Sequence, residues 1–319
     1  MPTCFQDAIP SAVAGPGLAG APARCAAPGA ESGPAGEPKP AHPGSGWRSS
    51  LNVEFRRLRG RSVVRSRHDG ALRCLSALHP EGDAVCHQVL VHPPGGLVGG
   101  DGLHVQLQLQ PGAHGLLTTP GASRFYRSLG APAVQSVEAT LHCGSRLEWL
   151  PLENIAFDAC IGENRARFHL APGAELIAWD MLALGLPAAG RPFASGSFLQ
   201  HMELPGLWLE RGRIDAADTT LLQGSGGLAG NSAIGTLVFA SAGPISAPRR
   251  ELLLHAARQA LQGVEGALAG ATCANSQVVV LRAIGQRIEP IATLFRAVWA
   301  GWRIAAWDLP ACAPRVWST

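Results

Sequence analysis

A pattern of strand, tight glycine turn and strand recurs along residues 109–208 and constrains the fold more than any other feature of this sequence. The turn glycines stand at positions 112, 144, 173 and 206, so that successive copies are about 30 residues apart. Self-similarity at this period is typical of stacked supersecondary units that share one core, as in solenoids. The pattern therefore predicts a mainly β fold of layered antiparallel strands with a β-helix-like progression. The 39 glycines and 25 prolines of the chain agree with a fold of many corners and short elements.

The period of the apolar residues changes near residue 250. Residues 251–268 carry leucine, alanine and valine at helical spacing, with Pro248 just before them. Residues 277–284 are rich in β-branched side chains and predict a strand. Residues 289–302 return to helical spacing, with Pro290 in the first turn. We therefore expect a helical C-terminal subregion that closes the β body.

The first 46 residues differ from the rest in composition. They consist mainly of Ala, Gly, Pro and Ser, with few large side chains. Such a segment buries too little apolar area to offset the entropy of ordering it, so we predict disorder for residues 1–46. Residues 47–319 are expected to form one β domain with the C-terminal helices.

Charge, hydropathy and cysteine usage exclude several classes of function. The net charge of +3 is too small to indicate nucleic-acid binding, and no Lys/Arg cluster is interleaved with aromatics. No apolar run approaches the length of a membrane span, which is about 18 residues. The eight cysteines contain no C-x-x-C pair, and no secretion signal precedes them. These features predict a cytoplasmic protein with reduced thiols.

Glycines are concentrated in the segment from residue 95 to residue 102. A phosphate-binding glycine loop opens a helix, whose N-terminal amides meet the phosphate. Here the segment leads instead into residues 103–110, where apolar and polar side chains alternate as in a half-buried strand. No Gly-Lys-Ser/Thr sequence occurs either, which argues against nucleotide binding. That the glycines only turn corners remains an open alternative.

The chain offers no supported catalytic nucleophile. It lacks the G-x-S-x-G nucleophile elbow, the H-E-x-x-H zinc-protease motif and the Walker sequence, and Ser123 has no identifiable base. Carboxylates beside apolar segments are more informative, namely Glu148, Asp180 and Glu210. A buried lone carboxylate is costly unless it is paired, hydrated or bound to a cation. These side chains either point to solvent or line a wet polar passage through stacked β layers. Four histidines are individual candidate metal ligands: His79, His87, His92 and His104.

Five sequence segments carry a family resemblance: HPPGGLVGGD (92–101), TTPGASRFYRS (118–128), LEWLPLENIAFD (147–158), Trp179-Asp180 and the terminal PRVWST. In this order they are similar to the UreD (also called UreH) family of urease accessory proteins. The match extends from about Trp47 to Thr319, and the pairing of the first two motifs is very specific.

The resemblance implies a predominantly β fold with a few helices and a cytoplasmic accessory protein rather than an enzyme. Such proteins bind apo-urease together with UreF and the GTPase UreG, and the assembly delivers nickel to the dinuclear urease centre. A water-filled tunnel through UreD is the proposed route, so nickel is expected in transit and no cofactor tightly bound. By motif position, the resemblance assigns four residues to the tunnel: Asp101, Ser123, Asp180 and Glu210.

Three departures from the family pattern bear on the detail of the tunnel lining. The Gly-Arg-Pro that commonly follows the Trp-acidic segment is replaced by Gly185-Leu186-Pro187. Leu152 stands where Gln is common, and Gly102 stands where a larger residue usually follows the Gly-Gly-Asp element.

Overall fold

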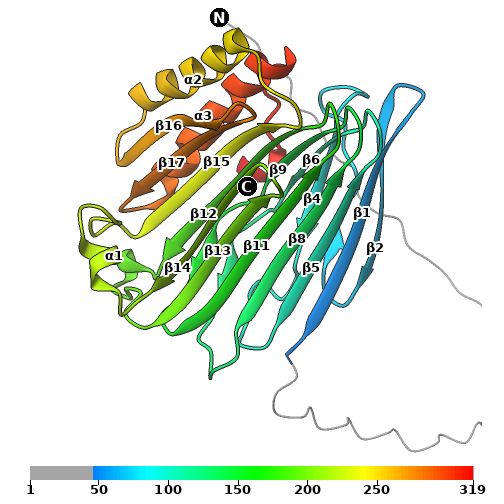
Figure 1. The fold of residues 1–319 in the computed structure, drawn as a ribbon. Coiled ribbons are helices and arrows are strands. Elements are labelled where there is room, and N and C mark those ends of the chain that lie inside the picture. The colour runs from blue at the N-terminus through cyan, green and yellow to red at the C-terminus, as the bar shows by residue number, and fades with distance from the viewer. Residues whose placement is uncertain (1–45, 319) are drawn as a thin grey trace, which may run out of the picture. The chain divides into compact units, whose positions relative to one another are not determined.

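The computed structural model describes residues 46–318, so the disorder predicted for residues 1–46 falls almost wholly outside the described residues. The described part forms two β-sheets that face each other, with helices against one of them (Figure 1). The seven-stranded sheet has the spatial order β14 (Trp208–Asp215), β13 (Gly196–Leu204), β11 (Cys160–Leu170), β8 (Ala133–Leu141), β5 (Gly102–Leu109), β1 (Arg48–Leu58) and β2 (Arg61–Asp69).

The second sheet contains ten strands. Its main path has the order β16 (Ala267–Asn275), β17 (Val278–Gly285), β15 (Ala233–Ser241), β12 (Glu175–Leu184), β9 (Arg146–Leu150), β6 (His114–Thr118), β4 (Cys86–Val91) and β3 (Arg73–Cys74). The short strand β10 (Asn154–Ala156) pairs with both β12 and β7 (Ser123–Phe125), beside the main path.

The chain alternates between the two sheets and builds a β-solenoid of about four turns, so the predicted mainly β, β-helix-like fold is confirmed. The strand direction differs from the expectation. The solenoid strands β1, β5, β8, β11 and β13 run parallel, as do β4, β6, β9 and β12. Antiparallel pairs lie toward the sheet ends, at β1 with β2, β13 with β14, β3 with β4, and among β12, β15, β17 and β16.

The glycine turns explain this difference. Gly112, Gly144 and Gly173 each join a strand of the seven-stranded sheet to a strand of the ten-stranded sheet, so the two strands stack face to face instead of pairing. Each strand then pairs with its equivalent one turn later, which runs the same way. Only the fourth copy is a hairpin, because Gly206 joins the antiparallel neighbours β13 and β14.

Successive turns are bonded to one another through the backbone. Gly112 N donates to Cys143 O at 3.1 Å, and Gly144 N donates to Pro172 O at 3.2 Å. The three glycines have φ of 68°, 63° and 74°, in the left-handed region that disfavours residues with a Cβ. The repeat seen in the sequence is therefore a column of stacked, glycine-dependent turns.

We predict that Gly144→Ala lowers the free energy of unfolding by about 1 kcal/mol, because alanine is strained at positive φ. A Cβ at Gly144 meets no atom within 4 Å, so the cost comes from the backbone rather than from a clash. Gly243→Ala is the matched control, because this glycine also has open space around it and no positive φ. Equal denaturant midpoints for the two variants would contradict the prediction.

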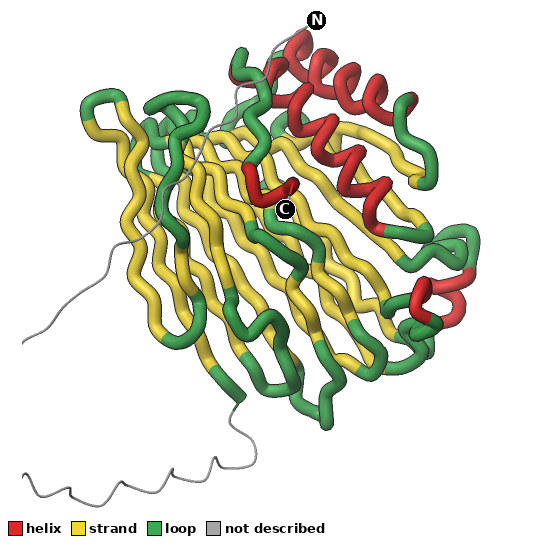
Figure 2. Tube along the Cα trace, turned by 180° about the vertical axis from the view of Figure 1, so that it is seen from behind, coloured by secondary structure: helices red, strands yellow, loops and turns green. Residues whose placement is uncertain are grey.

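Two apolar cores lie on the two faces of the ten-stranded sheet. The first fills the solenoid between the sheets and includes Phe55, Leu107 and Phe168. The second lies between the ten-stranded sheet and the helices α2 (Ala247–Gln262) and α3 (Ile288–Trp307). Figure 2, which views the molecule from behind, shows both helices in front of this sheet. The sheet is thus buried on both faces, which explains the nearly continuous burial of β12.

The helical C-terminal subregion is confirmed, with different bounds. The helix expected over 251–268 spans Ala247–Gln262, and the chain then turns into strand β16, which the sequence analysis missed. Val264 and Leu268 continue the three- and four-residue spacing past the end of the helix, so the pattern did not show where the helix stops. Short helices complete the fold: η1 (Pro187–Ala189), α1 (Thr219–Gln223) and η2 (Arg315–Ser318).

Candidate functional site

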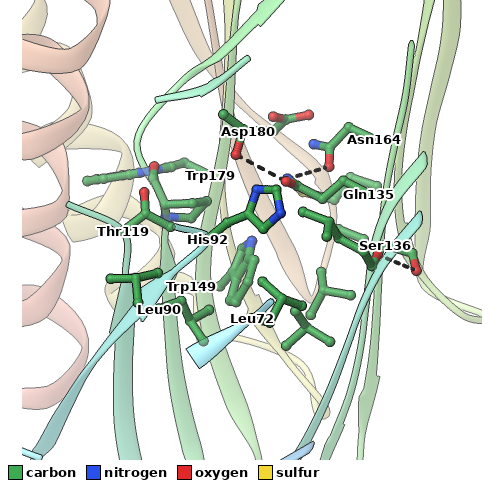
Figure 3. Close-up of a pocket in the computed structure, with 18 residues that line it drawn as sticks. Leu72, Leu90, His92, Thr119, Gln135, Ser136, Trp149, Asn164, Trp179 and Asp180 are labelled. Atoms are coloured by element: carbon green, nitrogen blue, oxygen red, sulfur yellow. Dashed lines mark hydrogen bonds between the residues drawn. The ribbon is translucent and has the colours of Figure 1, made fainter. Parts of the chain in front are cut away.

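A small cavity of about 60 Å³ lies inside the solenoid, between the two sheets (Figure 3). Apolar side chains from both sheets form much of its wall, among them Leu103, Val137 and Trp149. Polar side chains also line it: His92, Thr119, Ser123, Gln135, Ser136, Asn164 and Asp180. A water molecule needs roughly 10–15 Å³ of such space, so the cavity has room for several.

Asp180 is the carboxylate of this cavity, and its position follows from strand alternation in β12. Ala178 and Leu182 face the solenoid interior, whereas Trp179 and Met181 face the helices. Asp180 therefore also points inward, where it is 8% exposed. It accepts hydrogen bonds from Asn154 Nδ2 at 3.0 Å and Gln200 Nε2 at 3.1 Å. Amides, and no cation, surround this buried carboxylate among the described residues.

Burial raises the pKa of Asp180 to about 6. Hydrogen bonds from Gln200, Asn164 and Asn154 oppose this effect by stabilising the charged form, and the nearby charge of Glu210 reinforces it. The ordinary pKa of the group is 3.8, so in the folded state Asp180 holds its proton to a higher pH than in the unfolded chain. The protein therefore loses stability as the pH rises from about 4 to 6, and the cost is fully present above pH 6.

We predict that Asp180→Asn stabilises the protein at pH 7.5, by up to roughly 3 kcal/mol. Asparagine removes the buried charge, and the Gln200 amide can rotate to accept its N–H. The gain should shrink as the pH falls below 6 and vanish below about pH 3, where Asp180 is protonated in both states. Urea unfolding at several pH values measures this, and a variant less stable than the parent at pH 7.5 would contradict it.

Ser123 reaches Asp180 through a chain of amides. Ser123 Oγ donates to Gln135 Oε1 at 3.1 Å, and Gln135 Nε2 donates to Asn164 Oδ1 at 3.2 Å and to Asn154 Oδ1 at 3.4 Å. Asn154 in turn donates to Asp180. Two of the four residues assigned to the tunnel, Ser123 and Asp180, thus lie on one cavity and in one hydrogen-bonded network.

Asp101 lies outside the cavity, in the turn before β5. Its carboxylate accepts from Trp47 N at 2.8 Å and Val98 N at 2.9 Å, which fixes this turn. Asp101 also lines a surface groove of about 210 Å³ together with His92. His92 and Leu103 line the cavity as well, so these two side chains lie between groove and cavity. Burial lowers the pKa of His92, and the charge of Asp101 opposes that shift.

Glu210 also lies outside the cavity wall. It accepts from Thr236 Oγ1 at 2.5 Å and from Arg282 Nε at 2.6 Å, and so ties β14 of the seven-stranded sheet to β15 and β17 of the other. Thr236 is the strand partner of Asp180 in the β12–β15 pair. Glu210 is therefore adjacent to the Asp180 cluster but is engaged by an arginine.

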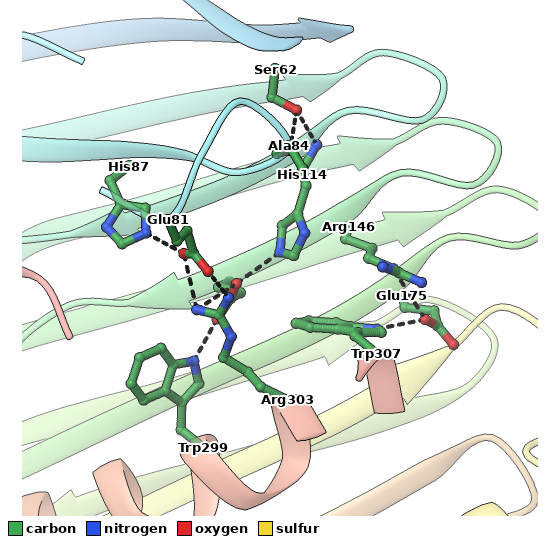
Figure 4. A network of polar contacts seen from close by, with 11 residues as sticks. Ser62, Glu81, Ala84, His87, His114, Arg146, Glu175, Trp299, Arg303 and Trp307 are labelled. Carbon is green, nitrogen blue, oxygen red and sulfur yellow. Dashed lines mark hydrogen bonds and ion pairs between the residues drawn. The ribbon is translucent and has the colours of Figure 1, made fainter. Parts of the chain in front are cut away.

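Glu148 alternates with the interior residues Leu147 and Trp149, so it points away from the interior into a second buried cluster. Figure 4 shows this cluster around Arg303. Its carboxylate contacts His114 Nε2 at 2.7 Å and Arg303 Nη1 at 3.7 Å, and accepts the indole N–H of Trp299. Arg303 also pairs with Glu81, which contacts His87. This cluster joins α3 to the ten-stranded sheet, and its acidic and basic side chains are paired with one another. We therefore interpret it as structural. The inward position considered for Glu148 is wrong.

The amides around Asp180 were not singled out from the sequence. Gln135 and Asn164 are direct strand partners in β8 and β11, one solenoid turn apart. Because the two amides occupy equivalent positions in successive repeats, an alignment of the repeats could have revealed a row of polar side chains. Three candidate histidines do not line the cavity: His79 contacts Ser62 O, His87 contacts Glu81, and His104 contacts the hydroxyl of the cavity residue Ser136.

Residues 46–318 contain no group of three His, Cys, Asp or Glu side chains placed to hold a metal ion. In the same range, no helix combines the length and apolar character needed to cross a membrane. The Asp180 cluster offers oxygen donors and room for water, but not a closed cage.

Fold and site together define a β-solenoid protein with a small, oxygen-lined polar cavity inside. A family model described as UreD urease accessory protein matches residues 48–318. The chain is 52% identical over 275 residues to the urease accessory protein UreD of Variovorax paradoxus, covering 86% of this chain and 99% of the relative. It is 53% identical over 273 residues to the UreD of Albidiferax ferrireducens, with 85% and 99% covered. The chain therefore belongs to the UreD urease accessory protein family.

Proposed function

We propose that this chain acts in urease maturation as a scaffold that binds apo-urease together with UreF and UreG, and as a conduit for nickel. Membership of the UreD family supports the role in maturation. The observation that carries the conduit is Asp180, a buried carboxylate held by amides inside a cavity with room for water. No cofactor is part of the proposal, and nickel is the cargo.

The donor set suits an ion in transit. Ni²⁺ accepts imidazole, carboxylate and water ligands. On the proposed route the ion passes the groove of Asp101 and His92, enters the cavity at Ser123 and Asp180, and leaves toward Glu210. One carboxylate with neutral neighbours binds a divalent ion weakly, which permits release. With a pKa of about 6, Asp180 is mostly ionised at pH 7.5 and available to a cation.

A second function, a clamp that binds urease without any ion passage, fits the same fold. The exposed outer face of the seven-stranded sheet favours it, because this face carries charged side chains on parallel strands, including Arg165, Arg167 and Glu203. The two functions differ in what a change inside the solenoid does. A clamp is insensitive to Asp180, whereas a conduit depends on it.

We predict that Asp180→Asn leaves co-purification with urease intact but lowers the nickel content of urease about tenfold, a loss typical when a group that binds or orients a metal is removed. Asparagine has nearly the volume of aspartate, and the variant is expected to gain stability because the buried charge is removed. Nickel per urease active site, measured after co-expression with urease and its accessory proteins, is the readout. Glu138→Gln is the matched control, because this carboxylate lies on the exposed outer face.

Asp180 is the better single target than Glu210, because replacing Glu210 also breaks its contacts with Thr236 and Arg282 between the two sheets. Normal nickel loading by a stable Asp180→Asn variant would exclude the conduit and leave the clamp. Loss of co-purification in the same variant would also count against the proposal, since it would place Asp180 in assembly rather than in transfer.

A further inference from the structure

The ten-stranded sheet is interrupted beside Asp180. On the side facing β9, strand β12 pairs with β9 along Glu175–Ala178 and with β10 along Leu182–Leu184. Residues 179–181 have no ladder partner on that side. The reason is local: β9 ends at Leu150, and residues 151–153 leave the sheet before β10 begins. β6 also ends here, at Thr118.

Side chains, and not paired backbone, close this interruption. Thr119, Pro151 and Trp179 all line the cavity. The indole N–H of Trp179 donates to Pro151 O at 2.5 Å and so bridges the gap in the ladder. Figure 3 shows the Trp179 ring directed away from Asp180, toward the helices. The cavity is therefore separated from the helix side of the sheet by little more than this ring and its neighbours.

The C-terminal segment covers the interruption from the helix side. Trp317 Nε1 donates to Thr118 Oγ1 at 2.8 Å, and Thr118 Oγ1 donates to Leu150 O at 2.7 Å. The Trp317 ring stacks on Trp179 with centroids 5.5 Å apart and planes inclined by 35°. Trp317 thus contacts β6 and β12 directly beside the gap, and reaches β9 through the Thr118 hydroxyl. Figure 2 shows this segment over the sheet beside α3.

The segment is held differently from the helix that precedes it. α3 is fixed by the buried pairs of Arg303 with Glu81 and Glu148. The chain then turns at Asp308, with φ of 53°, and residues 309–314 form neither helix nor strand. Trp317 itself is half-buried and lies against Trp299 and Arg296 of α3 through ring contacts. Residues 309–318 are therefore held by ring contacts and single hydrogen bonds, whereas α3 is held by buried ion pairs.

We propose that the C-terminal segment is a removable cover, in which Trp317 closes a second opening of the Asp180 cavity on the helix side of the ten-stranded sheet. When the segment is displaced, the Trp179 ring loses the stack that holds it against Pro151, and the interruption opens. For the conduit function proposed above, on which this role of the opening rests, the cover would keep the cavity closed on one side until a partner displaces residues 309–318.

Thiol labelling tests the cover without nickel or urease. Met202 lines the cavity and is 5% exposed, so Met202→Cys places a thiol inside while leaving the Asp180 network intact. In this background we expect Trp317→Ala to raise the rate at which a small methanethiosulfonate reagent modifies residue 202 by at least about tenfold, as local opening predicts. Mass spectrometry separates this site from the native cysteines. Trp317→Phe keeps the stacking ring and should remain close to the parent.

Gly144→Ala in the same background controls for general loss of stability, because it weakens the fold without touching the cover. An equal rise in this control, or an unchanged rate in Trp317→Ala, would overturn the proposal. The outcome is independent of Asp180→Asn and nickel loading. If Trp317→Ala does not speed labelling but Asp180→Asn lowers nickel loading, only the cover is excluded. If Trp317→Ala speeds labelling but Asp180→Asn leaves nickel loading unchanged, only the conduit is excluded.

Discussion

The rest of the structure depends on the backbone bonding between successive glycine turns. Each turn crosses from one sheet to the other, and Gly112 and Gly144 donate to the following turn. Because the strands are then in parallel register, residues at equivalent positions lie side by side from one turn to the next. This register places Gln135 beside Asn164 and brings both near Asp180. A polar row inside an apolar solenoid is thus a consequence of how the turns stack.

Two of the buried carboxylates, Glu148 and Asp180, have opposite surroundings. Glu148 contacts a histidine, an arginine and an indole, so its charge is matched where it joins α3 to the sheet. Asp180 is surrounded by neutral amides, and burial raises its pKa. A group whose charge is stabilised so incompletely weakens the fold at neutral pH, and groups of this kind cluster at functional sites. This contrast is the reason why Asp180, rather than the larger ionic cluster, carries the proposed conduit.

Much of this could be predicted from the sequence, within limits set by what periodicity reports. The spacing of the glycines predicted the solenoid, and the alternation of side chains in β12 allowed Asp180 to face the interior. Strand direction was not accessible, because a glycine turn looks alike whether it joins paired strands or stacked sheets. The orientation of Glu148 was not accessible either, since a sheet with apolar layers on both faces buries both sides of each strand. The position of Glu210 outside the cavity was not accessible either. It depends on the contact with Arg282, which is 72 residues away in the sequence and is brought near only by the fold.

The second apolar core has a consequence for how the chain folds during synthesis. One half of that core, including Leu116, Leu150 and Ile177, belongs to solenoid strands that can stack as they leave the ribosome. Its other half, Leu294, Phe295 and Trp299, lies on α3 and is translated more than about 100 residues later. Until then an apolar sheet face stays uncovered. Nascent chains of this protein should therefore need chaperone protection, and products that terminate before α3 should aggregate.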